Sequence, residues 1–101
     1  MKLYIDTSDR EQIIVGLNEK RFRSEAKENK SQKLLPFIVE ILTKEGRTFK
    51  DLKEIEVNLG PGSFTGLRVG VSVANALGWT LGIPVNGLDV SKGKVPDIKY
   101  E

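Results

Sequence analysis

Residues 54–59 alternate strictly between polar and apolar side chains, and this alternation limits what the chain can fold into. The apolar positions are Ile55, Val57 and Leu59. A strand covered by helices on both faces would be apolar at every position, so an alternating strand has one face in solvent. The third expected strand, over residues 20–26, alternates in the same way. We therefore expect a two-layer α/β domain, with helices on one side of a sheet and polar side chains on the other.

The hydrophobic periodicity of the whole chain predicts an element order of βββαβαβ. The predicted strands cover residues 2–5, 12–17, 20–26, 53–59 and 83–88. The predicted helices cover residues 31–45 and 65–81, with Gly46 ending the first and Pro36 in its first turn. Short turns make the first three strands an antiparallel meander. Right-handed crossovers then give a mixed five-stranded sheet with both helices on one face.

The chain has 101 residues, enough for one domain with a core of its own. We expect a folded lobe over residues 1–88 and a short polar tail over 89–101. Sixteen Lys and Arg residues are interspersed with fourteen Asp and Glu residues, which is typical of a solvated surface rather than a nucleic-acid face. Asp6 interrupts the apolar start expected of a signal peptide, and Arg68 and Pro84 interrupt the apolar stretch 67–85. We therefore expect a cytoplasmic protein that does not cross a membrane.

The chain contains neither cysteine nor histidine. A thiolate nucleophile, a disulfide framework, and the commonest metal ligand and general base are therefore excluded. Most familiar catalytic constellations are thus absent, and we expect no metal site and no cofactor.

The glycine-rich stretch LGPGSFTGLRVG, residues 59–70, lies between a predicted strand and a helix, which is the usual setting of a phosphate site. Its glycines do not fit the dinucleotide spacing, because three residues instead of two separate Gly62 from Gly66. They do not fit the Walker pattern either, because Leu67 and Arg68 stand where Lys and Ser or Thr would be needed. A looser anion site would use Ser63, Thr65 and Arg68. The alternative is structural: Ser63 or Thr65 caps the helix after a tight turn.

Small residues recur at every fourth position of the second predicted helix. They are Gly66, Gly70, Ala74, Gly78 and Gly82. Glycine inside a helix costs about 1 kcal/mol relative to alanine, so the row indicates a close approach of another element. That element is either the chain's own sheet and first helix, or a partner protein. On the opposite side Arg68 and Trp79 stand among polar residues, a combination enriched at protein interfaces.

Three segments resemble the TsaB, or YeaZ, family, the bacterial subunit for threonylcarbamoyladenosine (t6A) modification of tRNA. They are LYIDTS, SQKLLPFIVEIL and DLKEIEVNLGPGSFTGLRVGVSVANALGWTLGIPVNGL, within residues 1–88. The resemblance implies the N-terminal lobe of an actin/Hsp70-like ATPase superfamily member with a ribonuclease-H-like core. It also implies a non-catalytic subunit that docks through its two helices, onto a second copy or onto a TsaD-like partner. Direct contact with tRNA is not expected.

The resemblance also implies two sets of site residues. The docking surface would comprise Leu34, Phe37, Ile38, Ile41, Gly66, Gly70 and Ala74, to which the interface composition adds Trp79. Asp6, Thr7 and Ser8 match the first phosphate hairpin of the superfamily. Together with Ser63, Thr65 and Arg68 they form the candidate anion or nucleotide contacts of an alternative reading, a nucleotide-binding or ATPase-like protein. A minor third reading is RNA binding through Arg21 and Arg23.

The sequence departs from the family pattern in two places. Lys30 stands where the family usually has His before Ser-Gln, and the second lobe is missing. The charged alternation at Glu54, Glu56 and Asn58 favours a natural single-lobe homologue over a fragment, because a covered surface would be apolar.

Overall fold

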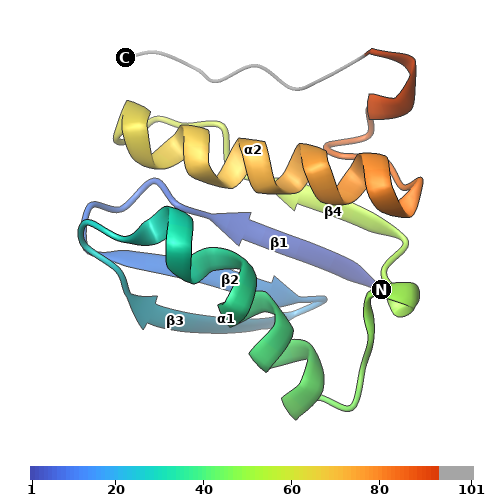
Figure 1. Ribbon diagram of the computed structural model, residues 1–101, viewed down its shortest axis with the longest axis horizontal. Helices are drawn as coiled ribbons and strands as arrows, with labels where there is room; N and C mark the ends of the chain where they lie inside the picture. The colour runs from blue at the N-terminus through green and yellow to red at the C-terminus, as the bar shows by residue number, and fades with distance from the viewer. Residues whose placement is uncertain (94–101) are drawn as a thin grey trace.

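The computed structural model describes residues 1–93, which form one sheet with two helices packed on it (Figure 1). The strands are β1 (Lys2–Asp6), β2 (Gln12–Leu17), β3 (Lys20–Glu25) and β4 (Glu54–Val57). The helices are α1 (Lys30–Lys44) and α2 (Phe64–Leu81), with short 3-10 turns η1 (Phe49–Asp51) and η2 (Val90–Lys92). These elements confirm the first six elements of the expected order.

The sheet has four strands in the order β3-β2-β1-β4. β1 pairs antiparallel with β2, and β2 pairs antiparallel with β3, which confirms the meander. β4 follows the first helical crossover and pairs parallel with β1, so that Leu3 lies beside Ile55 and Ile5 beside Val57. The sheet is therefore mixed: β2 and β1 form its centre, and β4, which precedes α2 in the chain, forms one edge.

The expected fifth strand over residues 83–88 is wrong, because only Val85 pairs there, through isolated bridges to Ile55 and Leu88. The next two residues, Asn86 and Gly87, have positive φ angles of 50° and 78° and turn the chain away from the sheet. The Asn86 carboxamide takes the place of the backbone hydrogen bonds that a fifth strand would have made with Val57. It accepts a hydrogen bond from the Val57 amide at 2.8 Å and donates one to the Val57 carbonyl at 3.0 Å.

Both helices cover the same face of the sheet, as expected (Figure 1). Alternate strand residues point into this layer and are fully or almost fully buried, among them Leu3, Ile5 and Ile55. The opposite face carries the polar alternation, and Glu54 and Glu56 are exposed there. Lys2 reaches across this face to Glu56 at 2.7 Å. The core therefore lies on one side of the sheet only.

Helix α1 begins one residue before the expected start, at Lys30, and contains Pro36 in its second turn rather than its first. Proline lacks an N–H, so the Gln32 carbonyl has no helical donor from position 36. The side chain of Pro36 is exposed, and so the freed carbonyl is on the solvent side of the helix.

The folded core extends beyond Leu88, the expected end of the lobe. Val90 in η2 is buried, and η2 packs against α2. The boundary predicted at residue 88 is therefore too early for residues 89–93, and the rest of the expected tail, 94–101, lies outside the described residues. Within residues 1–93, neither helix combines the length and apolar content needed to cross a bilayer.

Candidate functional site

The turn after β1 and the glycine-rich segment before α2 meet through one buried side chain, Thr7. Its hydroxyl donates a hydrogen bond to the Gly66 carbonyl at 2.5 Å and accepts one from the Gly70 amide at 3.1 Å. Gly66 and Gly70 are one helical turn apart, so a single hydroxyl contacts both members of an i, i+4 pair. Thr7 thereby fixes the first turns of α2 to the end of β1.

The row of small residues exists because α2 approaches its own sheet closely. A Cβ at Gly66 would collide with the Thr7 carbonyl oxygen, and one at Gly70 would lie 2.6 Å from the Thr7 hydroxyl. A Cβ at Gly78 would lie 2.5 Å from a Val85 methyl group. Gly82 has a different role, since it ends the helix in the left-handed conformation with φ 67°. The structural alternative for this row is therefore confirmed.

Six of the eight predicted docking residues are buried within the chain itself, and their assignment to an exposed interface is wrong. They are Leu34, Ile38, Ile41, Gly66, Gly70 and Ala74. The physical reason is that apolar three- and four-residue spacing marks the face a helix turns toward its own core. Phe37 is half-buried against this core. Trp79 alone of the set is well exposed, at 64%.

Three exposed apolar side chains of the helix layer were not among the docking residues expected from the sequence. Leu35, Val39 and Phe64 are each 43% exposed. With Trp79 they are the four large exposed hydrophobic residues of the described chain, and all four lie on α1 or α2. We refer to Leu35, Val39, Phe64 and Trp79 as the outer apolar set.

Asp6 is saturated with hydrogen bonds from its own neighbourhood. One carboxylate oxygen accepts from the Ser8 amide at 2.9 Å, the Ser8 hydroxyl at 2.6 Å and the Asn58 amide group at 3.1 Å. The other accepts from the Tyr4 hydroxyl at 3.3 Å. Burial alone would raise the pKa of Asp6, but these hydrogen bonds outweigh it and hold the pKa below its usual 3.8. Asp6, Thr7 and Ser8 are thus engaged in fastening loops together.

Ser63 is the N-cap of α2, which confirms the structural reading of the glycine-rich stretch. Its hydroxyl accepts from the Gly66 amide at 3.3 Å, and its own amide donates to the Ser8 carbonyl at 3.2 Å. Gly62 is needed because a Cβ there would lie 2.6 Å from the Ser8 Cβ. Arg68 points elsewhere, with its guanidinium 5.5 Å from the centre of the Phe64 ring. The six candidate anion contacts are therefore not gathered into one site.

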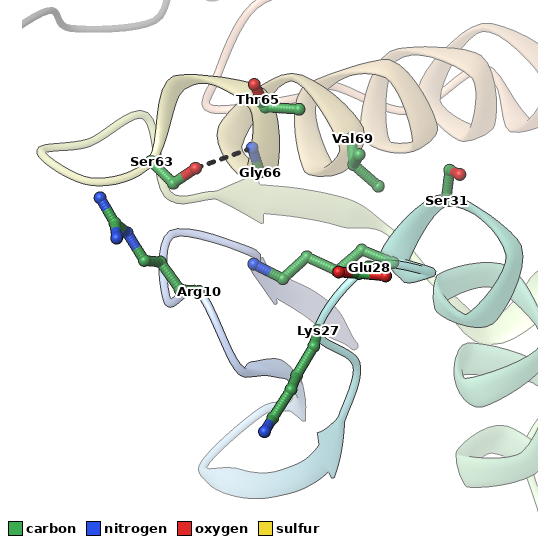
Figure 2. Close-up of a pocket in the computed structure, with 9 residues that line it drawn as sticks. Arg10, Lys27, Glu28, Ser31, Ser63, Thr65, Gly66 and Val69 are labelled. Carbon is green, nitrogen blue, oxygen red and sulfur yellow. Dashed lines mark hydrogen bonds between the residues drawn. The ribbon is translucent and has the colours of Figure 1, made fainter.

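A cavity of about 570 Å³ lies where α1 and α2 both begin (Figure 2). Its lining comes from the β1–β2 turn, the segment before α1 and the first turns of both helices. The lining residues are Arg10, Lys27, Glu28, Lys30, Ser31, Ser63, Thr65, Gly66 and Val69. Of the candidate anion contacts, only Ser63 and Thr65 line it. Sequence reasoning missed Arg10 and Lys27 as site residues and noted Lys30 only as a departure, because no local motif joins these segments.

Acidic side chains in the part of the chain that the structure describes form no group of three or more that could hold a metal ion.

Three comparisons relate the chain to known proteins. The family model described as "TsaD: tRNA N6-adenosine threonylcarbamoyltransferase" matches residues 23–95. The tRNA threonylcarbamoyladenosine biosynthesis protein TsaB of Bacillus subtilis is 37% identical over 90 residues, covering 85% of this chain and 39% of the relative. The Escherichia coli TsaB is 36% identical over 58 residues, covering 57% of this chain and 25% of the relative.

The structure of YeaZ from Pseudomonas aeruginosa matches with a TM-score of 0.72 at 26% identity, over 83% of this chain and 41% of that one. The chain thus spans about two fifths of the length of the B. subtilis and P. aeruginosa proteins. The family model covers well over half of the chain, and the curated relatives and the solved structure share the TsaB or YeaZ name. The chain therefore belongs to the family that the TsaD model describes and, with its curated relatives, to the TsaB (YeaZ) group, whose N-terminal region it matches.

Proposed function

We propose that this chain is a non-catalytic subunit of t6A biosynthesis that docks onto a TsaD-like protein, or onto a second copy of itself, through the outer face of its helix layer. The observation that carries the proposal is the outer apolar set, because all four of its members lie on α1 and α2. A cytoplasmic location and a ribonuclease-H-like lobe belong to the same proposal.

The outer apolar set has the composition of an interface. Trp79 is the residue type most enriched among interface hot spots, and its side chain is largely in solvent here. Leu35 and Val39 are four residues apart and lie on one side of α1. Because α1 and α2 contact each other and share one layer (Figure 1), a partner helix or loop could cover residues from both. Burying these side chains would contribute about 25 cal/mol per Å² of apolar surface removed from water.

The non-catalytic part of the proposal rests on how the conspicuous polar residues are used. Asp6 accepts four hydrogen bonds from within the fold, and the Thr7 hydroxyl is occupied by the backbone of α2. The chain also contains no histidine or cysteine.

The test is binding of the purified chain to the TsaD-like protein of the same organism, by calorimetry, with light scattering on the chain alone for self-association. Trp79→Ser should weaken the complex about tenfold or more, as expected when a tryptophan hot spot is truncated. Val39→Asp should weaken it by a similar factor, because docking would bury an unpaired carboxylate. Both side chains are exposed, so folding should be retained, which circular dichroism checks.

The matched control is Glu56→Gln on the exposed sheet face, which should leave binding unchanged. The proposal is wrong if neither helix variant affects binding to either partner, or if the sheet-face variant alone disrupts the complex.

A further inference from the structure

The cavity between the starts of α1 and α2 is distinct from the outer apolar set, and none of that set lines it. Its volume, about 570 Å³, lies within the range of small-ligand pockets. Figure 2 shows that its lining side chains come from separate segments of the chain, with Ser63 and Thr65 on one side and Ser31 on the other. The folded chain therefore presents a concavity at the end of its helix layer where both helices begin.

The charges lining this cavity are predominantly positive. Arg10, Lys27 and Lys30 contribute three positive charges, and Glu28 contributes one negative charge. Lys27 has a long, exposed contact with Glu11, at 3.9 Å. Among the described residues, Arg10 makes neither a hydrogen bond nor an ion pair. Its guanidinium is thus available to a ligand.

Lys30 is a buried cation without a carboxylate partner. Its side chain is only 7% exposed, and its ammonium donates to the main-chain carbonyls of Thr7, at 3.4 Å, and Asp9. Within residues 1–93 no carboxylate lies within ion-pair distance of it. Burial lowers the pKa of Lys30, although the more distant charges of Asp9 and Asp6 oppose this. Buried charges in proteins are normally paired with an opposite charge, so an anion in the cavity would supply what the chain does not.

The backbone adds to this positive character. Neither α1 nor α2 has an acidic residue in its first turn, and the N-cap of α1, Asn29, makes no side-chain capping bond. The positive ends of both helix dipoles therefore meet at the cavity without a first-turn carboxylate to offset them. Ser63 and Thr65 also bring hydroxyl groups to its wall.

From the buried Lys30 that no carboxylate neutralises, the unpaired Arg10, and Ser63 and Thr65 in the lining of the same cavity, we propose that this cavity binds a small phosphate-bearing anion. The phosphate oxygens accept hydrogen bonds from Arg10, Lys30 and the hydroxyls of Ser63 and Thr65. This site shares Ser63 and Thr65 with the set predicted from the sequence, but it replaces Asp6, Thr7, Ser8 and Arg68 by residues of three other segments. It is independent of docking through the outer apolar set.

The test is a titration of the isotopically labelled chain with inorganic phosphate at constant ionic strength, followed by amide chemical shifts. The expected result is a saturable shift at Ser31, Thr65 and Gly66. Arg10→Gln should weaken binding about tenfold or more, as loss of a charge-assisted hydrogen bond does. Lys30→Met should abolish saturation, and Arg10→Gln keeps the test decisive if Lys30→Met does not fold.

Arg68→Gln is the matched control, since Arg68 lies on the same helix but outside the cavity; its affinity should stay within twofold of the original. A parallel titration with AMP distinguishes the source of the phosphate, because tighter binding than inorganic phosphate indicates a nucleotide. Shifts that rise linearly without saturation, or equal weakening by Arg10→Gln and Arg68→Gln, would overturn the proposal.

Discussion

The Thr7 hydroxyl oxygen lies 3.1 Å from the Gly70 amide nitrogen, in the space that any side chain at position 70 would need. The contact joins residues 63 positions apart, and it sets how closely α2 can lie on β1.

Gly70→Ala should therefore destabilise the fold although alanine favours helices. The added Cβ would lie 2.6 Å from the Thr7 hydroxyl and 3.3 Å from an Ile5 methyl group. We expect a loss of about 1–3 kcal/mol in the free energy of unfolding, as for other overpacked sites. Urea denaturation measures it, with Ser72→Ala on the exposed side of α2 as the control. An unchanged or raised midpoint for Gly70→Ala would show that α2 can move outward at no cost.

Thr7→Val should cost about 1–3 kcal/mol of stability, because it keeps the shape of the side chain and removes the hydroxyl from a fully buried position. Thr7→Ser, which keeps the hydroxyl and loses a methyl group, separates the polar contribution from packing. If the hydrogen bonds of the Thr7 hydroxyl to Gly66 and Gly70 stabilise the fold, hydrogen exchange of the Gly70 amide will be faster in Thr7→Val than in Thr7→Ser.

Asp6 should make stability fall in acid. Its pKa is lower in the folded chain than the ordinary value of 3.8, so the folded state binds a proton less readily than the unfolded state does. The stabilisation is complete above pH 3.8 and is lost as the pH falls through the lowered folded pKa. The difference in unfolding free energy between the original chain and Asp6→Asn should therefore shrink between pH 5 and pH 2, measured by urea denaturation.

A second variant checks the cause of this pH dependence. Asn58→Ala removes one hydrogen-bond donor to the Asp6 carboxylate. The free energy of unfolding should therefore fall less between pH 5 and pH 2 in this variant than in the original chain, but it should still fall, because Ser8 still donates. A difference that stays constant with pH in both variants would contradict the lowered pKa.

Ser63→Ala should remove the N-cap of α2 and cost about 1 kcal/mol, the usual value for a lost serine cap. Thr65→Ala is the control, because Thr65 is exposed and does not cap the helix; its effect should stay within about 0.5 kcal/mol. Equal losses in the two variants, by thermal or chemical denaturation, would mean that the hydrogen bond from Gly66 contributes nothing.

The elements that could be predicted from sequence are those whose signal is local and repeated. The turn signals on either side located β2 to the residue, and three- and four-residue spacing located α1 and α2 to within one residue at each end. The strand expected over 83–88 failed because two positive φ angles, at Asn86 and Gly87, outweighed an apolar pattern.

The site residues were harder to predict, because periodicity gives the same signal for a core and for an interface. The family resemblance assigned Leu34 and Ile38 to docking, but both lie on the face of α1 that packs on the chain's own core. Leu35 shares the apolar spacing and is exposed nevertheless, so the spacing did not separate the buried positions from the exposed ones. The cavity joins Arg10 to Thr65 through tertiary structure alone, so no spacing in the sequence could have indicated it.

The turn at Asn86 has a consequence for unwanted association of this chain with other strands. An outermost strand offers unpaired amides and carbonyls on which a foreign strand can assemble, and proteins commonly block such edges. Here the blockade is a short piece of the same chain: Pro84 and the Asn86 backbone bind Ile55, and the Asn86 carboxamide binds Val57. Another strand could pair along β4 only after these hydrogen bonds were broken and the segment was displaced. Association at this edge is thereby discouraged, whereas the surface of the helices stays open.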